Sequence, residues 1–296
     1  MTARFGPAGN CIAFSAAHRS SLDAPDWLAR RGLDCYEYQC GKGVHIGEDT
    51  ARALGQRACD AGIALSLHAP YFINLANPDP EAVRRTVHYV LSACQAARWM
   101  GAARVVVHSG ALMGRSRGEA LAIAKDTLLT VLAACDGAGY GDIALCPETM
   151  GKINQLGDLD EVLALCTLDA RLLPCIDFGH LYARSLGADE GAEVFRQMLD
   201  QVQAALGEDR AARFHSHFSH IEFTPKGGEK RHRTFADSGG YGPDWTPLAR
   251  EIARRGWHPT FICESAGTQA EDALTMKQIY LDCVARRGGA RKIPKQ

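Results

Sequence analysis

The chain has 296 residues, of which 46% are hydrophobic and 23% charged, and its formal net charge is -1 at pH 7. This is an ordinary composition for a soluble protein, and the length allows one large α/β domain with a sizeable core. The small net charge excludes a surface dominated by basic residues, so a polyanionic partner would need a local patch of cations.

The N-terminal segment, MTARFGPAGNCIAFSAAHRS, lacks the basic start and the long apolar core of a signal peptide. No later apolar run approaches the roughly 20 residues of a membrane span. We therefore expect a cytoplasmic protein that does not enter a membrane. The eleven cysteines form no C-x-x-C pair, and most stand singly in apolar stretches, so we interpret them as reduced and buried.

Short apolar or β-branched runs recur along the chain and predict eight strands, at residues 10–16, 33–39, 64–70, 104–110, 142–148, 172–178, 213–219 and 259–265. The stretches between them have helical spacing of apolar residues, for example at 48–62, 80–101 and 117–139, and several end in Gly.

Eight alternations of strand and helix, without a linker or charge block, predict a single (β/α)₈ TIM barrel over residues 1–296. The last residues, about 287–296, are expected to form a flexible tail. A doubly wound open sheet is the competing arrangement. The absence of a glycine-rich phosphate loop from the sequence favours the barrel.

A TIM barrel builds its functional site at the C-terminal ends of its strands. Six consecutive predicted strands end in or near a His, Asp or Glu, usually with aliphatic residues just before it. Burying so many carboxylates and imidazoles in one mouth is costly unless a cation compensates, so we predict a metal site there. The strand-end residues are His68, His108, Glu148, Asp177 with the following His180, His217 and Glu264.

The stretch HSHFSHIEFTPKGGEKRH, residues 215–232, contains four histidines that alternation along a strand can sort. His215 and His217 share one face of the predicted strand, and the phenylalanines share the other, which suits packing against helices. His217 lies nearer the strand end and is the predicted ligand, with His215 as its partner in the layer beneath. His220 is out of phase and is expected on a loop. His232 lies in a basic turn that could fold back over the mouth.

Eight candidate ligands exceed the requirement of one zinc-like ion, which takes about four. Two or three ions would use them all if some residues bridge. The imidazole-rich set favours zinc, or manganese, over magnesium. Neighbouring ions of this kind can polarise a phosphoryl oxygen and activate water, which is the chemistry of phosphoester hydrolysis.

At these residues the chain resembles the endonuclease IV family of apurinic/apyrimidinic endonucleases (AP endonuclease family 2). The matching segments follow the family's order over nearly the whole chain: HAPYFINLA (68–76), VVVHSG (105–110), PETMGKINQLG (147–157), CIDFGH (175–180) and CES (263–265). The resemblance implies a TIM barrel with three zinc ions that cleaves DNA 5′ to abasic sites in base excision repair. DNA containing abasic sites would then be the partner.

Carried over residue by residue, the resemblance implies that His68 and His108 bind the first zinc and that Glu148 bridges it to the second. Asp177, His217 and Glu264 would complete that pair, and His180 and His232 would hold the third zinc. We further expect Glu148 and Glu264 to be the catalytic residues. The expected DNA or substrate contacts are Tyr71, Asn74, Lys230 and Arg231.

Two departures from the family pattern affect this assignment. The family has an aspartate two residues before the histidine that matches His232, and here that position is Lys230. The third ion has therefore lost a carboxylate unless Glu222 or Glu229 substitutes for it. The second βα loop, QCGKGVHIG, is short and carries no evident arginine to insert into DNA. Cations that could instead meet phosphates are Arg115, Arg117, Lys226, Lys230, Arg231 and Arg233.

Two other functions fit parts of the sequence. The xylose isomerase-like sugar or sugar-phosphate isomerases and epimerases resemble only the set Glu148, Asp177, His217 and Glu264 around one divalent ion, with the glutamates as acid and base. Such an enzyme would not need His68, His108 or His232. A non-catalytic barrel that binds nucleic acid or a partner is the third interpretation, with Lys230 as its support. The sequence indicates no obligate protein partner.

Overall fold

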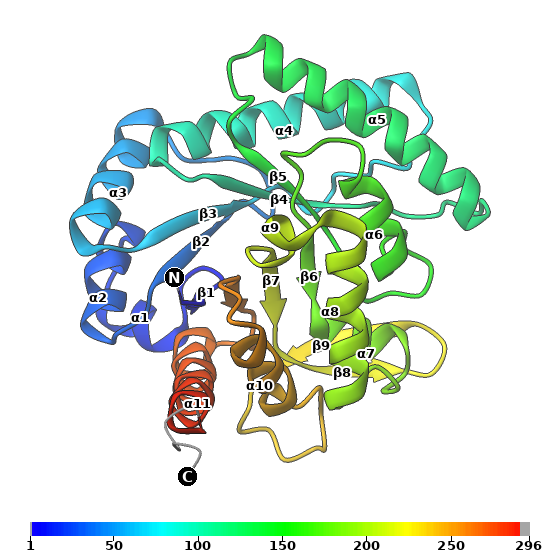
Figure 1. Cartoon of the computed structure of the whole chain (residues 1–296). Coiled ribbons are helices and arrows are strands. Elements are labelled where there is room, and N and C mark those ends of the chain that lie inside the picture. Colours follow the sequence, from blue (N-terminus) through cyan, green and yellow to red (C-terminus); the bar gives the residue numbers. More distant parts are fainter. Residues whose placement is uncertain (1, 291–296) are drawn as a thin grey trace.

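Eight parallel strands lie in the centre of the molecule with helices around them, as Figure 1 shows. The computed structural model describes residues 2–290, and the strands follow the order β1-β10-β7-β6-β5-β4-β3-β2 in a nearly closed barrel. The predicted TIM barrel is confirmed. The barrel strands are β1 (Arg4–Pro7), β2 (Cys35–Gln39), β3 (Ala64–His68), β4 (Arg104–His108), β5 (Ala144–Glu148), β6 (Cys175–Asp177), β7 (His215–Phe218) and β10 (Thr260–Cys263).

The helices that surround the barrel begin and end largely where their capping residues predict. The helices are α1 (Ile12–Ala17), the short 3₁₀ helix η1 (Ser21–Asp23), α2 (Ala24–Arg30), α3 (Glu48–Ala61), α4 (Pro80–Met100), α5 (Arg117–Gly137), α6 (Leu159–Cys166), α7 (Phe178–Arg184), α8 (Ala192–Leu206), α9 (Glu208–Ala211), α10 (Trp245–Arg255) and α11 (Gln269–Ala290). Asp79 caps the start of α4, and Gly101 ends it in the left-handed conformation. The predicted helices at 48–62, 80–101 and 117–139 therefore match α3, α4 and α5 closely.

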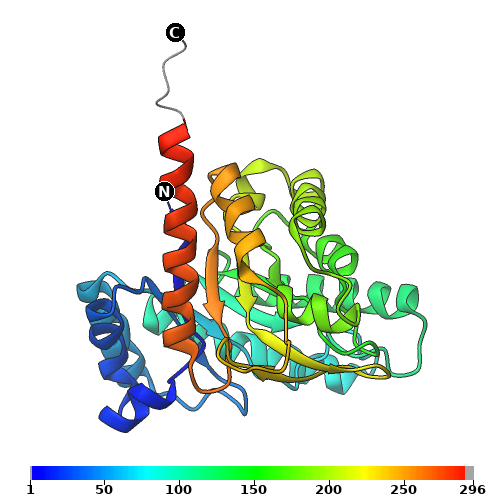
Figure 2. The same ribbon diagram turned by 90° about the horizontal axis from the view of Figure 1, so that it is seen from below.

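The C-terminal helix runs beside the first strand, as Figure 2 shows. The ring of Phe5 lies 5.4 Å from that of Tyr280, which fixes the two ends of the described chain together. The expected tail, about 287–296, begins inside α11, which continues to Ala290, and residues 291–296 lie outside the described residues. None of the described helices is long and apolar enough to cross a membrane.

The predicted first strand, at residues 10–16, is wrong. Residues 12–17 form α1, whose start is capped by the Cys11 sulfur accepting from the Phe14 backbone N–H. The true first strand is the four-residue segment β1, which contains both Gly6 and Pro7. Neither residue favours a strand, so the local sequence gives no strand signal there.

The barrel closes between β1 and β2 because β1 carries a glycine at the point of closest approach. A Cβ added to Gly6 would lie 1.8 Å from the Cys35 carbonyl oxygen. Just beyond, Ala8 bridges to Glu37, and the Gly9 N–H donates to the Glu37 carbonyl at 2.9 Å. A residue with a side chain at position 6 would hold the two strands apart.

The two faces of the strands differ sharply in polarity. Outward-facing residues are apolar and pack against the helices, as in the stacked rings of Phe5 and Phe261 with Trp245 across them. The cysteines fit this core, since all eleven are free and all but Cys59 and Cys283 are buried. The inner face instead buries polar residues on several strands, including Glu37, Ser66, His68, Glu148, Asp177, His215 and His217.

A two-stranded antiparallel hairpin, β8 (His220–Thr224) and β9 (Gly228–Arg233), follows directly after β7. It lies across the end of the barrel where the strands finish, as Figure 2 shows. The expectation that His220 lies on a loop is therefore wrong. His220 opens β8, and its ring stacks on Phe235 at 4.6 Å, away from the barrel interior.

Candidate metal centre

The C-terminal ends of the strands surround a cavity of about 380 Å³. The predicted ligands lie at or just after the ends of the barrel strands, except His232, which lies on the hairpin after β7, so the barrel brings them to one place. Asp177 and His217 lie just beneath the cavity and are fully buried. The cavity is lined by Gln39, Gly41, His68, Tyr71, His108, Glu148, Met150, Lys152, Gln155, His180, Glu229, His232 and Glu264.

Glu148, at the end of β5, is the centre of the arrangement. Its Oε2 lies 3.2 Å from His68 Nε2 and 3.4 Å from His108 Nε2. Its Oε1 lies 3.0 Å from His217 Nδ1 and 3.6 Å from His180 Nδ1. One carboxylate thus faces two groups of imidazoles on its two sides, which is the geometry that a bridging ligand needs.

Each imidazole has one nitrogen fixed by a protein oxygen. The Nδ1 atoms of His68, His108 and His180 donate to the carbonyl oxygens of residues 69, 71 and 149, at 2.8, 3.0 and 2.8 Å. A carbonyl oxygen can only accept, so Nδ1 carries a proton and Nε2 is the nitrogen that can bind an ion. These three rings are therefore pre-oriented as ligands.

His217 and His232 are oriented the same way by side chains. His217 Nε2 lies 2.9 Å from Glu37 Oε1, which leaves Nδ1 toward Glu148 and Glu264. His232 Nδ1 lies 2.8 Å from the Ser219 hydroxyl, which leaves Nε2 within 3.9 Å of Glu264 Oε2. All five imidazoles thus direct one nitrogen toward the carboxylates of the mouth.

Asp177 supplies an independent indication that a cation belongs at this site. Its Oδ1 accepts from the His180 backbone N–H, but its buried Oδ2 accepts no hydrogen bond. His180 Nδ1 lies 3.3 Å from that oxygen, but this nitrogen already donates to a carbonyl. A buried carboxylate oxygen without a donor is costly, and a divalent cation would satisfy it.

Electrostatics in the mouth are dominated by the balance between carboxylates and imidazoles. Burial disfavours ionised Glu148, but the neighbouring His217 and His68 imidazoles hold its pKa well below the usual range. Burial raises the pKa of Asp177, and Glu264 and Glu148 raise it further against the effect of His180. Carboxylates this close to one another need cationic partners, which are protons on imidazoles or metal ions.

The described residues contain three overlapping groups of potential ligands in this mouth, each with ligand atoms within 4.8 Å of one another. The donor set combines imidazole nitrogens with carboxylate oxygens, which fits zinc or manganese better than magnesium. The groups are His68, Glu148 and His217; Glu148, Asp177, His217 and Glu264; and His180, His232 and Glu264.

Glu37 is a residue of this site that the sequence reasoning missed. It is fully buried on β2 and contacts His217, His215 Nε2 at 2.8 Å and the Ser66 hydroxyl at 2.9 Å. The signal was present, because alternation in CYEYQ places Glu37 on the face opposite Tyr36 and Tyr38. Glu37 lies in the middle of its strand, whereas the predicted ligands lie at strand ends. His215, expected in the layer beneath His217, lies there and contacts the same carboxylate.

A β-bulge decides which residues of β9 face the mouth. The pairing shifts between Glu222 and Phe223, so that Arg231 pairs with Glu222 while Glu229 pairs with Phe223, and Lys230 is the extra residue. The bulge puts Glu229 and His232 on one side of the strand. Glu229 Oε2 lies 3.7 Å from His180 Nε2, and its Oε1 lies 4.0 Å from His232 Nε2.

The other predicted residues of the hairpin are engaged with one another. Glu222 forms ion pairs with Lys230, Arg231 and Arg233, and these cations lower its pKa to about 2. Of the two proposed substitute ligands, the structure thus brings Glu229 to the mouth and keeps Glu222 among cations. Lys230 and Arg231, expected to contact DNA or substrate, do not line the cavity.

Residues of the β3–α4 and β4–α5 loops divide between the cavity and the scaffold. Tyr71 lines the cavity and has 57% of its surface exposed. The Asn74 side-chain oxygen Oδ1 instead accepts from the backbone N–H groups of Ala76 and Ala111, which ties the two loops together. Arg117 pairs with Glu161 and so belongs to the scaffold rather than to a free phosphate-binding surface.

Comparison with known proteins places these features in a family. The chain matches the xylose isomerase-like TIM barrel family over residues 25–279. It is 33% identical over 273 residues to an uncharacterized protein of Methanocaldococcus jannaschii, covering 92% of this chain and 95% of that one. A probable endonuclease 4 of Nitratidesulfovibrio vulgaris is 27% identical over 201 residues, covering 66% of this chain and 68% of the relative.

Solved structures of two different enzyme types share the fold. A D-tagatose 3-epimerase-like protein aligns with a TM-score of 0.69 at 18% identity, covering 96% of this chain and 99% of that one. Endonuclease IV from Thermus thermophilus aligns with a TM-score of 0.64 at 18% identity and the same coverage. At this identity the likeness shows the fold alone. The chain, an eight-stranded barrel with endonuclease 4 homologues, therefore belongs to the xylose isomerase-like TIM barrel family.

Proposed function

We propose that this protein is a metal-dependent phosphodiesterase of the endonuclease IV type that cleaves DNA 5′ to abasic sites. The observation that carries the proposal is the number of ligands around one mouth. Three overlapping groups of His, Asp and Glu side chains lie there, whereas a single divalent ion needs about four ligands. The endonuclease 4 homologues support the same interpretation from the sequence.

The ligand groups suggest where each ion would bind, with two residues outside those groups added from their distances. His108 is added because it lies beside Glu148, and Glu229 because it lies beside His180 and His232. The first would use His68 and His108, with Glu148 shared between it and the second. The third would use His180 and His232, with Glu229 in place of the aspartate that Lys230 replaces. The second would use Glu148, Asp177, His217 and Glu264. Zinc is the proposed metal, with manganese as the alternative.

Bound ions would supply Lewis-acid polarisation of a phosphoryl oxygen and activation of water. The protein's own part is to hold the substrate phosphate among these ligands and to orient it. Lys152 lies on the cavity wall and offers an ammonium group to a phosphate. Glu148 and Glu264 are the proposed catalytic carboxylates, because both face the cavity between ligand groups.

The rim of the cavity supports a substrate with a nucleoside-like face. Tyr71 and Phe72 are 57% and 43% exposed, and Met113 nearby on the β4–α5 loop is 52% exposed. Exposed aromatic side chains beside a phosphate-binding mouth suit stacking against bases, which would keep an extrahelical sugar-phosphate in place.

The test is incision of a labelled duplex carrying one tetrahydrofuran abasic analogue by protein whose bound zinc and manganese have been quantified. We expect a single cut 5′ to the analogue, abolished by prolonged chelation and by Glu148→Gln. Fully metallated protein that leaves the duplex intact would overturn the proposal.

A sugar or sugar-phosphate epimerase is the second candidate. Glu148, Asp177, His217 and Glu264 form a four-ligand group of their own, which is enough for one ion and an acid–base pair. The fold is shared with a D-tagatose 3-epimerase-like protein. One ion per chain together with epimerisation of a ketose, and no incision, would favour this candidate.

A further inference from the structure

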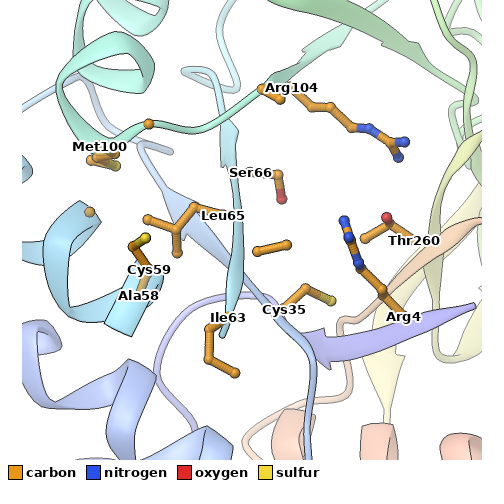
Figure 3. Close-up of a pocket in the computed structure, with 14 residues that line it drawn as sticks. Arg4, Cys35, Ala58, Cys59, Ile63, Leu65, Ser66, Met100, Arg104 and Thr260 are labelled. Carbon is orange, nitrogen blue, oxygen red and sulfur yellow. The ribbon is translucent and has the colours of Figure 1, made fainter. Parts of the chain in front are cut away.

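A second cavity, of about 330 Å³, lies at the opposite end of the barrel, where the strands begin (Figure 3). It extends from the barrel interior to the C-terminal ends of α3 and α4. Its lining residues include two arginines, Arg4 and Arg104, and no carboxylate among the described residues that surround it. None of its lining residues belongs to the metal centre described above.

The two arginines occupy the same layer of the barrel. Arg4 is the first residue of β1 and Arg104 the first of β4, and Arg4 pairs with Thr260 at the start of β10. Figure 3 shows the two guanidinium groups reaching into the space beside Ser66 and Thr260. Both side chains line the same cavity. Burial lowers the pKa of Arg104, and the nearby positive charges of Arg213 and Arg4 lower it further.

Neither guanidinium has an anionic partner within residues 2–290. Arg104 donates to the carbonyl oxygens of Arg213, at 2.9 Å, and of Phe214, at 3.4 Å, and its Nη1 lies 3.5 Å from His215 Nδ1. None of these acceptors is a carboxylate. Arg4 is exposed and Arg104 is partly buried. Two like charges beside one cavity without a counter-ion are unfavourable, and an oxyanion would compensate both. The arrangement therefore favours a dianionic ligand.

We propose that this cavity is a binding site for a small phosphate-bearing ligand, held by Arg4 and Arg104. A guanidinium donates two parallel hydrogen bonds to an oxyanion, so two of them suit a tetrahedral phosphate. The Thr260 hydroxyl lines the cavity as a further donor. Ala58, Ile63, Leu65 and Met100 provide an apolar wall for an uncharged part of the ligand.

The cavity is large enough for more than a free ion. Water occupies roughly 30 Å³ per molecule, so about 330 Å³ holds a phosphate together with a short organic group. Inorganic phosphate and a small organic phosphate are thus two sources of the same chemistry. The proposal does not depend on the reaction at the metal centre, because the two cavities lie at opposite ends of the strands.

Calorimetric titration of the metal-loaded protein with inorganic phosphate and with glycerol 3-phosphate, at constant ionic strength, tests the proposal. We expect saturable binding that weakens at least about tenfold in Arg4→Gln, because one of two charge-assisted partners is lost. Tighter binding of glycerol 3-phosphate would identify an organic phosphate as the ligand, and equal binding would identify free phosphate. Arg4 is the exposed first residue of β1, so its replacement leaves the core intact.

The matched control is Arg98→Gln, which removes a cation at the same end of the barrel that does not line the cavity and that pairs with Asp142. This variant should change the affinity by less than about threefold. Binding that survives Arg4→Gln but disappears on chelation would place phosphate at the metal centre and overturn the proposal. Absence of saturable binding to the unsubstituted protein would also overturn it. Incision activity is measured separately, so failure of the proposed function would be seen independently.

Discussion

Glu37 influences the mouth of the barrel without lining it. Its carboxylate accepts from His215 and His217 and from the Ser66 hydroxyl, so it fixes two rings of one strand at once. Such an outer partner sets the orientation and basicity of a metal-ligating imidazole. Its own pKa is held well below the usual range by those histidines, against the effect of burial.

Glu37→Gln should weaken zinc binding about 10- to 100-fold, the usual effect of losing an outer carboxylate partner. The amide keeps the shape of the side chain but loses the negative charge that faces His217 Nε2. Competition with a chromophoric chelator measures the affinity. Glu193→Gln, an exposed carboxylate on α8, is the control and should bind zinc as the unsubstituted protein does. Equal affinities for the two variants would show that Glu37 does not support the metal centre.

Metal affinity should depend on pH through His68 and His180. Burial alone would lower both pKa values, but Glu148 raises the pKa of His68 to about 9, and Asp177 with Glu229 raises that of His180 to about 9. In the metal-free protein both rings are therefore protonated at pH 7, and an ion must displace those protons.

The expected result is that zinc affinity rises with pH up to about 9, by about tenfold per pH unit for each proton released. In the metal-free protein the same shifts stabilise the fold fully below the ordinary pKa of about 6.5, and this stabilisation is lost as the pH rises through about 9. Calorimetry in buffers of different ionisation enthalpy counts the protons. Binding without proton release would contradict the prediction.

The histidines of residues 215–232 show which side-chain positions the sequence of one strand can predict. Alternation along a strand placed His215 and His217 on the inner face, because it depends only on backbone geometry. Their common partner on β2 could not be inferred the same way, because residues 37 and 217 are neighbours only once the barrel has formed.

Among the structural elements, the β8–β9 hairpin decides how the third group of ligands is completed. The bulge at Lys230 turns Glu229 toward His180 and His232, where regular alternation would have turned Lys230. In the proposed three-ion site, Glu229 would therefore take the place of the family's aspartate at position 230. This depends on the register of two paired strands, which the sequence of one strand does not reveal.

Glu229→Gln should lower the metal content by about one ion per chain while the ions at Glu148 remain, because the amide is a weaker ligand than a carboxylate. Elemental analysis of purified protein provides the measurement. Lys230→Gln is the matched control on the same strand and should leave the metal content unchanged, since the Lys230 ammonium pairs with Glu222 outside the mouth. The same loss in both variants would mean that the hairpin, rather than the Glu229 carboxylate, holds the ion.

The strand β1 closes the barrel against β2, and this depends on Gly6. Gly6→Ala should destabilise the protein by about 1–3 kcal/mol, because the new methyl group would meet the Cys35 carbonyl oxygen and push β1 from β2. Denaturant unfolding followed by circular dichroism measures the change. Gly118→Ala on α5, where an added Cβ meets nothing within 4 Å, should leave the stability unchanged or raise it slightly.

For the whole molecule, the site concentrates negative charge in one end of the barrel. Glu37, Glu148, Asp177, Glu229 and Glu264 come from several separate strands and converge on one region. Their mutual repulsion opposes folding unless protons or metal ions neutralise it. Folding and metal binding should therefore be linked.

Removing the metal should lower the melting temperature by several degrees. An ion that binds only the folded state stabilises it by about 2.7 kcal/mol when its free concentration is 100 times its dissociation constant. Scanning calorimetry of zinc-loaded and chelator-treated protein at pH 7 measures the difference, and restoring zinc should reverse it. The same melting temperature with and without zinc would show that the mouth does not bind the ion.

The barrel, and the His, Asp and Glu residues at the ends of its strands, could be predicted from the amino-acid sequence without any structure. Strand–helix alternation is a local property, and the polar residues at strand ends follow from the need of every parallel barrel to gather those ends together. The same reasoning failed for β1, where Gly6 and Pro7 serve closure of the barrel rather than local strand preference.

Only the tertiary structure shows which of the polar residues at the strand ends contact one another. The contact of Glu37 with His215 and His217, the bulge that presents Glu229, and the pair of arginines at the opposite end all join residues that are far apart in the chain or depend on strand register. Side-chain alternation repeats every two residues, so a single bulged residue reverses what a strand presents. No pattern within one segment contains that information.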